Sequence, residues 1–376
     1  MSLAIHKAKT FVKSVARRHP VKKNAIAEAM RRQIVAGRLP PGARLPTRRG
    51  LARHHGVSVN TVQDALSELA HDGLVVAHGR RGAFVADRLP HLARCGLVLP
   101  PLSDRPDHVS HKPFYAALRT EALRQRQRDN LELKIYENVV GHANDPQFLR
   151  LADDLRRCQL AGLIVMDPGM FAATPLAQLR QVNLPIVSIS ATAGPDFLRV
   201  HPNQEQMIEQ ALDYFVAHGR RRIAILDQGP WKWKFIRAAL AARALETRPS
   251  WMQFVPAAAR ETARGMMRLL LQGRELPEGL LIADDSLVEP ATAGLRDEGV
   301  CQSNPIDVVA LGNFPAPTRS HVPCHRIGFD VREVLATCVR LIQQRRQGEF
   351  VPAVTEIAPV WDSQWSAQPV NKRAHA

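Results

Sequence analysis

The sequence predicts an α/β protein in two parts, an N-terminal winged helix-turn-helix and a larger body of doubly wound parallel sheets. Residues 45–85 carry two short helical segments separated by Gly56-Val57, followed by two alternating strands around a glycine-containing turn. Beyond residue 93, short apolar runs alternate with amphipathic helices, which is typical of parallel strands buried on both faces. Residues 1–90 contain 17 Lys and Arg against 5 Asp and Glu, whereas the remainder has 34 against 30. We therefore expect a basic front part and a nearly neutral body.

The totals bound the class of protein. A chain of 376 residues is long enough for two or three domains with sizeable cores. No apolar run of about 18 residues and no signal-peptide pattern occurs, so we expect a cytoplasmic protein with no membrane partner. The five cysteines are dispersed and fit a reducing compartment better than a disulfide framework. They are Cys95, Cys158, Cys301, Cys324 and Cys338.

Residues 1–23 form a basic extension with seven Lys or Arg and no acidic residue. Two interpretations remain open for this stretch. It is either a solvated, disordered tail or an arm that adds non-specific contacts to phosphates.

Residues 24–86 contain the predicted winged helix. An amphipathic segment, Ala25–Leu39, supplies a first helix, and Thr47–His55 supplies a second. Ser58 is a good N-cap for a third helix, whose apolar stripe must face the others. That stripe consists of Val62, Ala65, Leu66 and Leu69. The strands Leu74–Ala77 and Ala83–Ala86 then form a wing. A helical hairpin that packs a core and binds nothing is the alternative, but the arginines around the outward face favour a DNA-binding domain.

These residues resemble the winged helix of the GntR family of bacterial transcription regulators. The matching motifs are GRLPPGARLPT, GVSVNTVQDALSELAHDGLV and AHGRRGAFV. Many family members have Arg where Val59 and Gln63 stand here, so the operator sequence cannot be transferred. Val59 is suited to a thymine methyl and Gln63 to adenine. Together, the resemblance and the basic surface give these candidate DNA-binding residues: Arg44, Arg48, Arg49, Ser58, Val59, Asn60, Thr61, Gln63, His78, Gly79, Arg80 and Arg81.

A linker over residues 87–92 leads to the body. The expected strands are Cys95–Leu99, Leu131–Tyr136, Gly162–Val165, Ile186–Ile189, Arg222–Leu226, Gly279–Ala283, Asp307–Leu311 and a late strand, Val354–Ile357. The expected helices are Phe114–Arg128, Pro146–Arg157, Thr174–Gln181, Asn203–His218, Lys234–Leu245, Glu261–Leu271, Ser286–Glu298 and Val331–Gln344. This alternation predicts two doubly wound sheets, whose ligands lie beyond the carboxyl ends of the strands.

Residues 93–361 resemble the LacI/GalR-type effector domain, which is similar to type I periplasmic binding proteins. The motifs include CGLVLPPLSD, NLPIVSIS, LLIADDSLVEPATAGLRDEGV and IDVVALGNFP, and a tail over 362–376 follows. The resemblance implies two α/β lobes joined by a three-strand hinge that close on a small molecule, usually a sugar. A GntR-type DNA-binding domain followed by an effector domain of this type is the arrangement of the arabinose-repressor class.

The same resemblance places the effector between the lobes. The residues that it assigns to the cleft are Ser103, Asp104, Phe114, Tyr115, His201, Asn203, Trp231, Asp284, Asp285 and Asn313. Trp231 stands where the family usually has an arginine, and an indole can stack on a sugar ring. Each assignment has a structural alternative. Asp284 or Asp285 could cap the following helix, His201 could be structural, and the aromatic residues could pack in the core or lie on the surface.

Other functions leave little trace in the sequence. No G-x-S-x-G, P-loop or H-E-x-x-H motif is present, so we expect no catalytic residue and no enzyme activity. His321, Cys324 and His325 lie close in sequence but lack a matched second pair, so we expect no metal. Two alternatives stay open. One is a pyridoxal-phosphate-binding aminotransferase-like domain behind the reader, and the other is a ligand-independent dimeric DNA-binding protein. We expect no cofactor.

The sequence thus predicts a regulator, most often a repressor in this class, that binds a pseudo-palindromic double-stranded DNA operator as a homodimer. A small molecule, expected to be a sugar, controls that binding from the cleft between the lobes.

Overall fold

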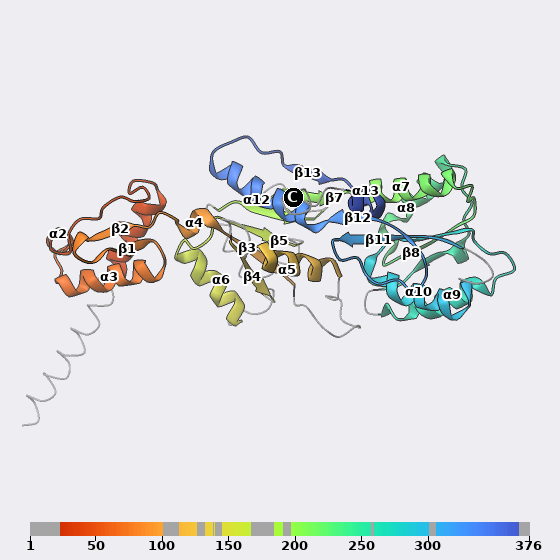
Figure 1. Ribbon diagram of the computed structural model, residues 1–376, viewed down its shortest axis with the longest axis horizontal. Helices are drawn as coiled ribbons and strands as arrows, with labels where there is room; N and C mark the ends of the chain where they lie inside the picture. Colours follow the sequence, from red (N-terminus) through yellow and green to blue (C-terminus); the bar gives the residue numbers. More distant parts are fainter. Residues whose placement is uncertain are drawn as a thin grey trace, which may run out of the picture. The chain divides into compact units, whose positions relative to one another are not determined.

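The computed structural model describes residues 23–100, 113–125, 132–137, 139, 145–166, 184–190, 197–256, 259–300 and 306–367, except the side chains of Arg80 and Trp231. Ser103, Asp104, the predicted helix Thr174–Gln181 and the basic extension up to residue 22 lie outside these residues. The chain divides into two compact units. Unit 1 comprises Met1–Gly96, Asn130–Glu132 and Leu149–Gly162, and unit 2 comprises the rest (Figure 1).

The first part of unit 1 is a winged helix-turn-helix. Residues 23–35 are helical and precede α2 (Arg48–His55), α3 (Val59–His71), β1 (Val75–Ala77), the turn η1 (Gly79–Arg81) and β2 (Ala83–Val85). The Ser58 side chain caps α3, and Gly56 ends α2 with φ of 61°, a left-handed conformation that glycine adopts without strain. The helices and wing share one apolar core that includes Ile34, Leu66 and Leu69. The predicted winged helix is therefore confirmed.

A third short extended segment, residues 43–45, pairs with the wing, and the sequence did not indicate it. The amide of Leu45 donates to the carbonyl of Ala83 at 2.9 Å, and the amide of Val85 donates to the carbonyl of Ala43 at 2.8 Å. Arg44 bridges Phe84 between these two bonds. The stretch after Pro40-Pro41 thus pairs with β2 and fixes Arg44 beside the wing.

The segment expected as a linker is ordered structure. Leu89 is buried in the winged-helix core, and α4 (Pro90–Ala93) follows it directly. His91 is also buried, at 3% exposure. Leu89, Pro90 and His91 of this segment are therefore buried, whereas Asp87, Arg88 and Leu92 are exposed.

Two six-stranded sheets form the body, and their layers are visible in Figure 1. The first has the order β13-β7-β6-β5-β3-β4 and the second β14-β12-β11-β10-β8-β9. The first sheet consists of β3 (Arg94–Leu99), β4 (Glu132–Glu137), β5 (Gly162–Val165), β6 (Ile186–Ile189), β7 (Leu198–Pro202) and β13 (Val354–Ile357). The second consists of β8 (Ile223–Asp227), β9 (Met252–Phe254), β10 (Gly279–Ile282), β11 (Asp307–Phe314), β12 (His325–Asp330) and β14 (Val360–Trp361). This confirms the predicted doubly wound architecture.

The helices between the strands lie close to the expected ones, whereas a further short helix, α13, lies in the stretch that was expected to be a C-terminal tail. They are α5 (Pro113–Gln125), α6 (Pro146–Arg156), α7 (Gln204–Ala217), α8 (Trp233–Ala242), α9 (Thr262–Leu271), α10 (Val288–Asp297), α12 (Val331–Arg346) and α13 (Asp362–Ala367). Short 3₁₀ turns, η4 (Pro230–Lys232), η5 (Pro249–Trp251) and η7 (Asp285–Leu287), precede some of these elements. The part of the chain that the structure describes contains no helix long and apolar enough to cross a membrane.

The chain crosses between the two sheets three times. It leaves the first sheet after β7 through α7, returns after β12 through α12, and crosses again from β13 to β14. Within the second sheet, β11 and β12 approach so closely at Gly312 and Gly328 that a Cβ on Gly328 would lie 1.7 Å from the Gly312 carbonyl oxygen. This glycine contact fixes the register that brings Asn313 and Asp330 to the carboxyl edge of the sheet.

Candidate DNA interface and effector site

The N-terminus of α3 presents some of its candidate residues outwards and uses others for its own structure. Val59 is 42% exposed, and Asn60 and Gln63 are exposed as well. Thr61 is buried, and its hydroxyl lies 2.8 Å from the Ser58 hydroxyl, which also accepts a 3.1 Å hydrogen bond from the Thr61 amide. Ser58 and Thr61 therefore set the start of the helix, while the exposed side chains of Val59, Asn60 and Gln63 face outwards, where a base edge could lie.

A polar chain links α2 to this surface. Arg48 Nη1 donates to Gln63 Oε1 at 2.6 Å, and Gln63 Nε2 donates to Ser67 Oγ at 3.2 Å. The Gln63 amide is thus held in one orientation before any ligand arrives. The Gln63 amide retains one further lone pair and one further N–H, which are the groups that a bidentate contact with adenine uses.

The wing tip depends on two glycines with positive φ, Gly79 at 53° and Gly82 at 107°. The His78 amide donates to the Gly82 carbonyl at 2.9 Å, and the His78 ring packs edge-on against Phe84 at 5.4 Å. His78 and Gly79 are exposed at this tip, whereas the Arg80 side chain lies outside the described residues. The wing therefore offers a stiff, exposed backbone turn with one aromatic side chain held against it.

Exposed arginines come from the segment before α2, from α2 itself and from the wing. They are Arg44, Arg48, Arg49, Arg53 and Arg81. Guanidinium groups in such positions suit phosphate oxygens, which they can bind with two parallel hydrogen bonds.

In the second sheet, three strands end in polar side chains at the same edge. Asp227 ends β8, Asp284 and Asp285 follow β10, and Asn313 lies near the end of β11. Asn313 Nδ2 donates a short hydrogen bond to Asp285 Oδ2, and the two residues are 3% and 4% exposed. The structure thus brings together two residues that the resemblance assigned to the effector site, 28 positions apart in sequence.

Asp284 has a capping role in the described structure. Its Oδ1 accepts from the amide of Ser286 at 2.9 Å and from the Ser286 hydroxyl at 2.5 Å. Gln228 Nε2 in turn donates to the Ser286 hydroxyl at 2.6 Å. These hydrogen bonds join the end of β8 to the end of β10. Asp284 therefore caps the turn η7, which is the structural alternative that the sequence left open for it.

Asp227 and Lys232 are two further polar residues at this edge that were not among the candidates expected from the sequence. Asp227 is 1% exposed, and its Oδ2 lies 3.2 Å from Lys232 Nζ. Burial raises the pKa of Asp227 above its ordinary value because the carboxylate loses hydration, and the Lys232 charge and the Gln228 amide oppose this shift. The available signal was the polar pair Asp227-Gln228 at the end of the apolar run of β8, because ligands of doubly wound sheets lie beyond the carboxyl ends of the strands.

One helix from the first sheet contacts this edge. Residues of α5 lie beside η7, which contains Asp285, and beside β11, which contains Asn313. Phe114 and Tyr115 stand in the first turn of α5, half-buried, with their rings 6.2 Å apart. Within unit 2, α5 is therefore the helix of the first sheet that contacts the two elements holding Asp285 and Asn313.

The remaining candidates occupy the crossings. His201 lies in β7 opposite Glu356 of β13. Asn203 caps α7 by accepting from the Gln206 amide at 2.9 Å, and its Nδ2 donates to Glu356 Oε2 at 3.0 Å. Trp231 has its backbone in η4, but its side chain lies outside the described residues. Asn203 thus has structural partners at the point where the chain passes between sheets.

The possible metal residues do not form a set. His321 Nδ1 lies 2.9 Å from Arg296 Nη1, and the ring of His325 packs against Tyr214 with centroids 4.8 Å apart. Among the residues that the structure describes, no group of three or more His, Cys, Asp or Glu is arranged to hold a metal ion.

Comparisons with known proteins give different results for the two parts of the chain. Residues 22–85 match the family described as bacterial regulatory proteins, gntR family. The HTH-type transcriptional regulator Rv1152 of Mycobacterium tuberculosis is 44% identical over 63 residues, which are 16% of this chain and 52% of that protein. The chain spans about half or less of the length of the curated relatives that it matches.

The body is similar to solved structures of LacI-family regulators. A LacI-family regulatory protein from Chloroflexus aggregans has a TM-score of 0.55 and 18% identity, covering 73% of this chain and 97% of that chain. The Cra transcriptional dual regulator from Pseudomonas putida, in complex with fructose 1-phosphate, has a TM-score of 0.52 and 17% identity, covering 73% and 99%. The expected combination, a GntR helix-turn-helix and a LacI-type fold, is confirmed.

Proposed function

We propose that this chain is a transcription regulator that binds a double-stranded DNA operator through residues 22–85 and a small molecule through its LacI-type body. The GntR match and the exposed face of α3 support the first half. The fold of the body supports the second, because LacI-family regulators share it. The proposed action is repression by a homodimer at a two-fold operator, since a symmetric protein matches a symmetric site.

The Asp285–Asn313 hydrogen bond beside α5 is the observation that carries the effector site. A carboxylate and an amide at the carboxyl edge of a parallel sheet are suited to the hydroxyls of a sugar, and aromatic rings are suited to its apolar face. Cra from Pseudomonas putida is described with fructose 1-phosphate. We therefore assign a sugar or sugar phosphate as the effector class, bound by Asp285, Asn313, Phe114 and Tyr115, together with Ser103, Asp104 and Trp231.

The alternatives differ from this proposal in ways that can be tested. The fold of the body is that of LacI-type regulators, which leaves the aminotransferase-like domain without support. A ligand-independent DNA-binding dimer remains, and in that case the body would bind no sugar. The proposal assigns no enzyme activity to the chain and no catalytic role to Asp227 or Asp285.

Thermal unfolding of the full chain against a panel of sugars and sugar phosphates tests the sensing half. A ligand present at 100 times its dissociation constant stabilises the folded state by about 2.7 kcal/mol, which raises the melting temperature by several degrees. At least one panel member, fructose 1-phosphate included, should give a saturable rise. If no sugar or sugar phosphate shifts the transition at millimolar concentration, the proposed effector class is wrong.

Replacing Arg49 by alanine is expected to weaken operator binding by roughly tenfold at moderate salt, because one guanidinium–phosphate contact is lost. The measurement is a fluorescence anisotropy titration of labelled DNA with the full chain. Arg268→Ala is the charge-matched control, since Arg268 is an exposed arginine on α9 in the other unit. Equal affinities of the Arg49 and Arg268 variants would remove Arg49 from the interface.

A further inference from the structure

Asp72 caps the C-terminal end of α3 and binds two arginines from different parts of unit 1. Its side chain is 2% exposed. Arg31, in the helical residues 23–35, donates from Nη2 to Asp72 Oδ2 at 2.6 Å. Arg157, which directly follows α6, donates from Nη1 to Asp72 Oδ1 at 3.0 Å. One carboxylate is therefore shared between the winged helix and the end of α6.

Gln159 makes a second connection to the same residue. Its Nε2 donates to the backbone carbonyl of Asp72 at 2.9 Å, and its Oε1 accepts from Arg94 Nη1 at 3.1 Å. Arg94 begins β3 and is also paired with Glu132, at the start of β4, at 2.6 Å. The end of α3 is thus joined by hydrogen bonds to the first residues of two strands of the first sheet.

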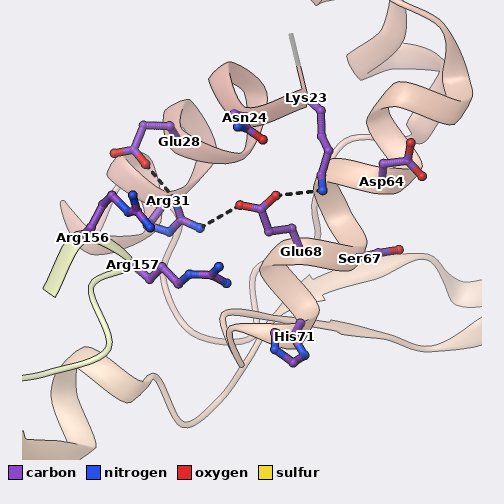
Figure 2. Close-up of a pocket in the computed structure, with 10 residues that line it drawn as sticks. All are labelled: Lys23, Asn24, Glu28, Arg31, Asp64, Ser67, Glu68, His71, Arg156 and Arg157. Atoms are coloured by element: carbon purple, nitrogen blue, oxygen red, sulfur yellow. Dashed lines mark hydrogen bonds and ion pairs between the residues drawn. The ribbon is translucent and has the colours of Figure 1, made fainter. Parts of the chain in front are cut away.

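This contact is polar rather than apolar. The core cluster of the winged helix draws its described members from residues 26–89 and includes none from 149–162. A cavity of about 700 Å³ lies beside the contact, and its lining side chains are all polar or charged (Figure 2). Helix 23–35, α3 and the end of α6 each contribute to that lining. The contact therefore consists largely of directed hydrogen bonds and ion pairs centred on Asp72.

The lysine and arginines that line the cavity are already paired with carboxylates, which argues against a separate anion site there. Lys23 lies 3.1 Å from Glu68, Arg31 lies 2.7 Å from Glu28, and Arg157 is 2.8 Å from Asp153. The hydrogen bond with Asp72 raises the pKa of the Arg157 guanidinium above its usual value, so this group stays charged in the folded protein. The ion pairs around Asp72 thus serve to hold the elements together.

We propose that Asp72, Arg157 and Gln159 form a latch through which the effector body controls the orientation of α3. The helix α6 is continuous from Pro146 to Arg156, and its first three residues belong to unit 2 while the remainder belongs to unit 1. A shift of α6 is therefore carried directly to Arg157 and Gln159. Because Asp72 caps the C-terminal end of α3, the shift is passed on to α3, and the N-terminal end of this helix carries Val59 and Asn60. The effect of this latch on DNA binding rests on the proposed function, whereas the connection from α6 to α3 through Asp72 does not.

Hydrogen exchange of the full chain, followed by mass spectrometry, tests the mechanical link without DNA or effector. Arg157→Gln and Gln159→Ala leave the buried Arg31–Asp72 pair intact, so the winged helix stays folded. In contrast, removing Asp72 would strand a buried arginine. We expect the amides of residues 72–74, at the turn after α3, to exchange about tenfold faster in both variants, because local opening becomes more frequent.

Arg156→Gln is the matched control. Arg156 neighbours Arg157, is 73% exposed, and pairs with Asp153 of its own helix. Its replacement should leave exchange at residues 72–74 unchanged. If Arg157→Gln and Gln159→Ala also leave these amides unchanged, or if Arg156→Gln accelerates them equally, the latch does not exist.

Operator binding then tests its role. In the Arg157→Gln variant, affinity for a duplex with two half-sites should fall about tenfold, because the two winged helices of a dimer are no longer held in one orientation before they bind. Affinity for a duplex with a single half-site should stay constant. An equal loss on both duplexes would mean that Arg157 contacts DNA, and no loss on either would refute the control of α3. If the unaltered chain binds no DNA, the proposed function fails, while the exchange result still decides whether the latch exists.

Discussion

Replacing Asp285 by alanine is expected to weaken effector binding by about 100-fold or more and to leave operator DNA binding intact. The carboxylate is buried and holds the Asn313 amide, so its removal deletes one hydrogen-bond acceptor for a sugar hydroxyl and releases a second polar group. A site that loses a charged partner and leaves a buried donor unpaired loses several kcal/mol of interaction energy. Titration calorimetry with the sugar or sugar phosphate that raises the melting temperature measures this directly.

Asp297→Ala is the control for that experiment. Asp297 ends α10 in the same lobe and forms an exposed pair with Arg264, so its loss changes the net charge equally without touching the carboxyl edge. The Asp297→Ala variant should bind the effector as tightly as the unaltered chain does, whereas the Asp285→Ala variant should not. An Asp285 variant with undiminished affinity would move the effector elsewhere.

Replacing Asn60 by alanine is expected to lower operator affinity by roughly 10- to 100-fold and to reduce discrimination at one base pair. Asn60 is exposed in the first turn of α3, and an asparagine there can bind adenine with two hydrogen bonds, worth about 1–3 kcal/mol. Competition titrations with operators altered one base pair at a time would locate that position. The lost affinity should be confined to the preferred base.

Gln33→Ala is the amide-matched control, since Gln33 is exposed in the helical residues 23–35 of the same winged helix. It should bind the operator as the unaltered chain does. Uniform weakening of the Asn60 variant on every sequence would instead make Asn60 a phosphate contact.

Most of the architecture follows from local patterns. The apolar runs of β5, β6 and β10 and the periodic faces of α7 and α12 gave boundaries within a few residues of those observed. The strands β7, β9 and β12 escaped detection because they are short or begin with polar residues, as in His325-Arg326 of β12. Such strands are stabilised by pairing with their neighbours, which a single sequence does not record.

The candidate sites likewise contain residues that could be predicted from the sequence and residues that could not. The resemblance to the LacI/GalR-type domain assigned Asp285 and Asn313 to one site, and the structure places them in hydrogen-bond contact at the carboxyl edge of the second sheet. The burial of Thr61 follows from its place on the apolar side of α3, which motif matching alone did not reveal. The contact between Asp72 and Arg157 could not be predicted, because the two residues are 85 positions apart and no local pattern indicates which distant residue Asp72 binds.

The proposed coupling is reciprocal. If the effector lowers operator affinity by some factor, the operator must lower effector affinity by the same factor. The latch offers a route for that coupling through α6, in addition to the covalent connection at residues 87–92.

Selection of bound duplexes from a random DNA pool by the full chain, followed by titration over a salt series, tests the central claim most directly. We expect an enriched motif with two related half-sites and an affinity that falls steeply with salt. The logarithm of the binding constant should fall with the logarithm of the salt concentration with a slope of about −0.9 for each phosphate contacted. A pool without enrichment, together with an affinity that is indifferent to salt, would contradict it.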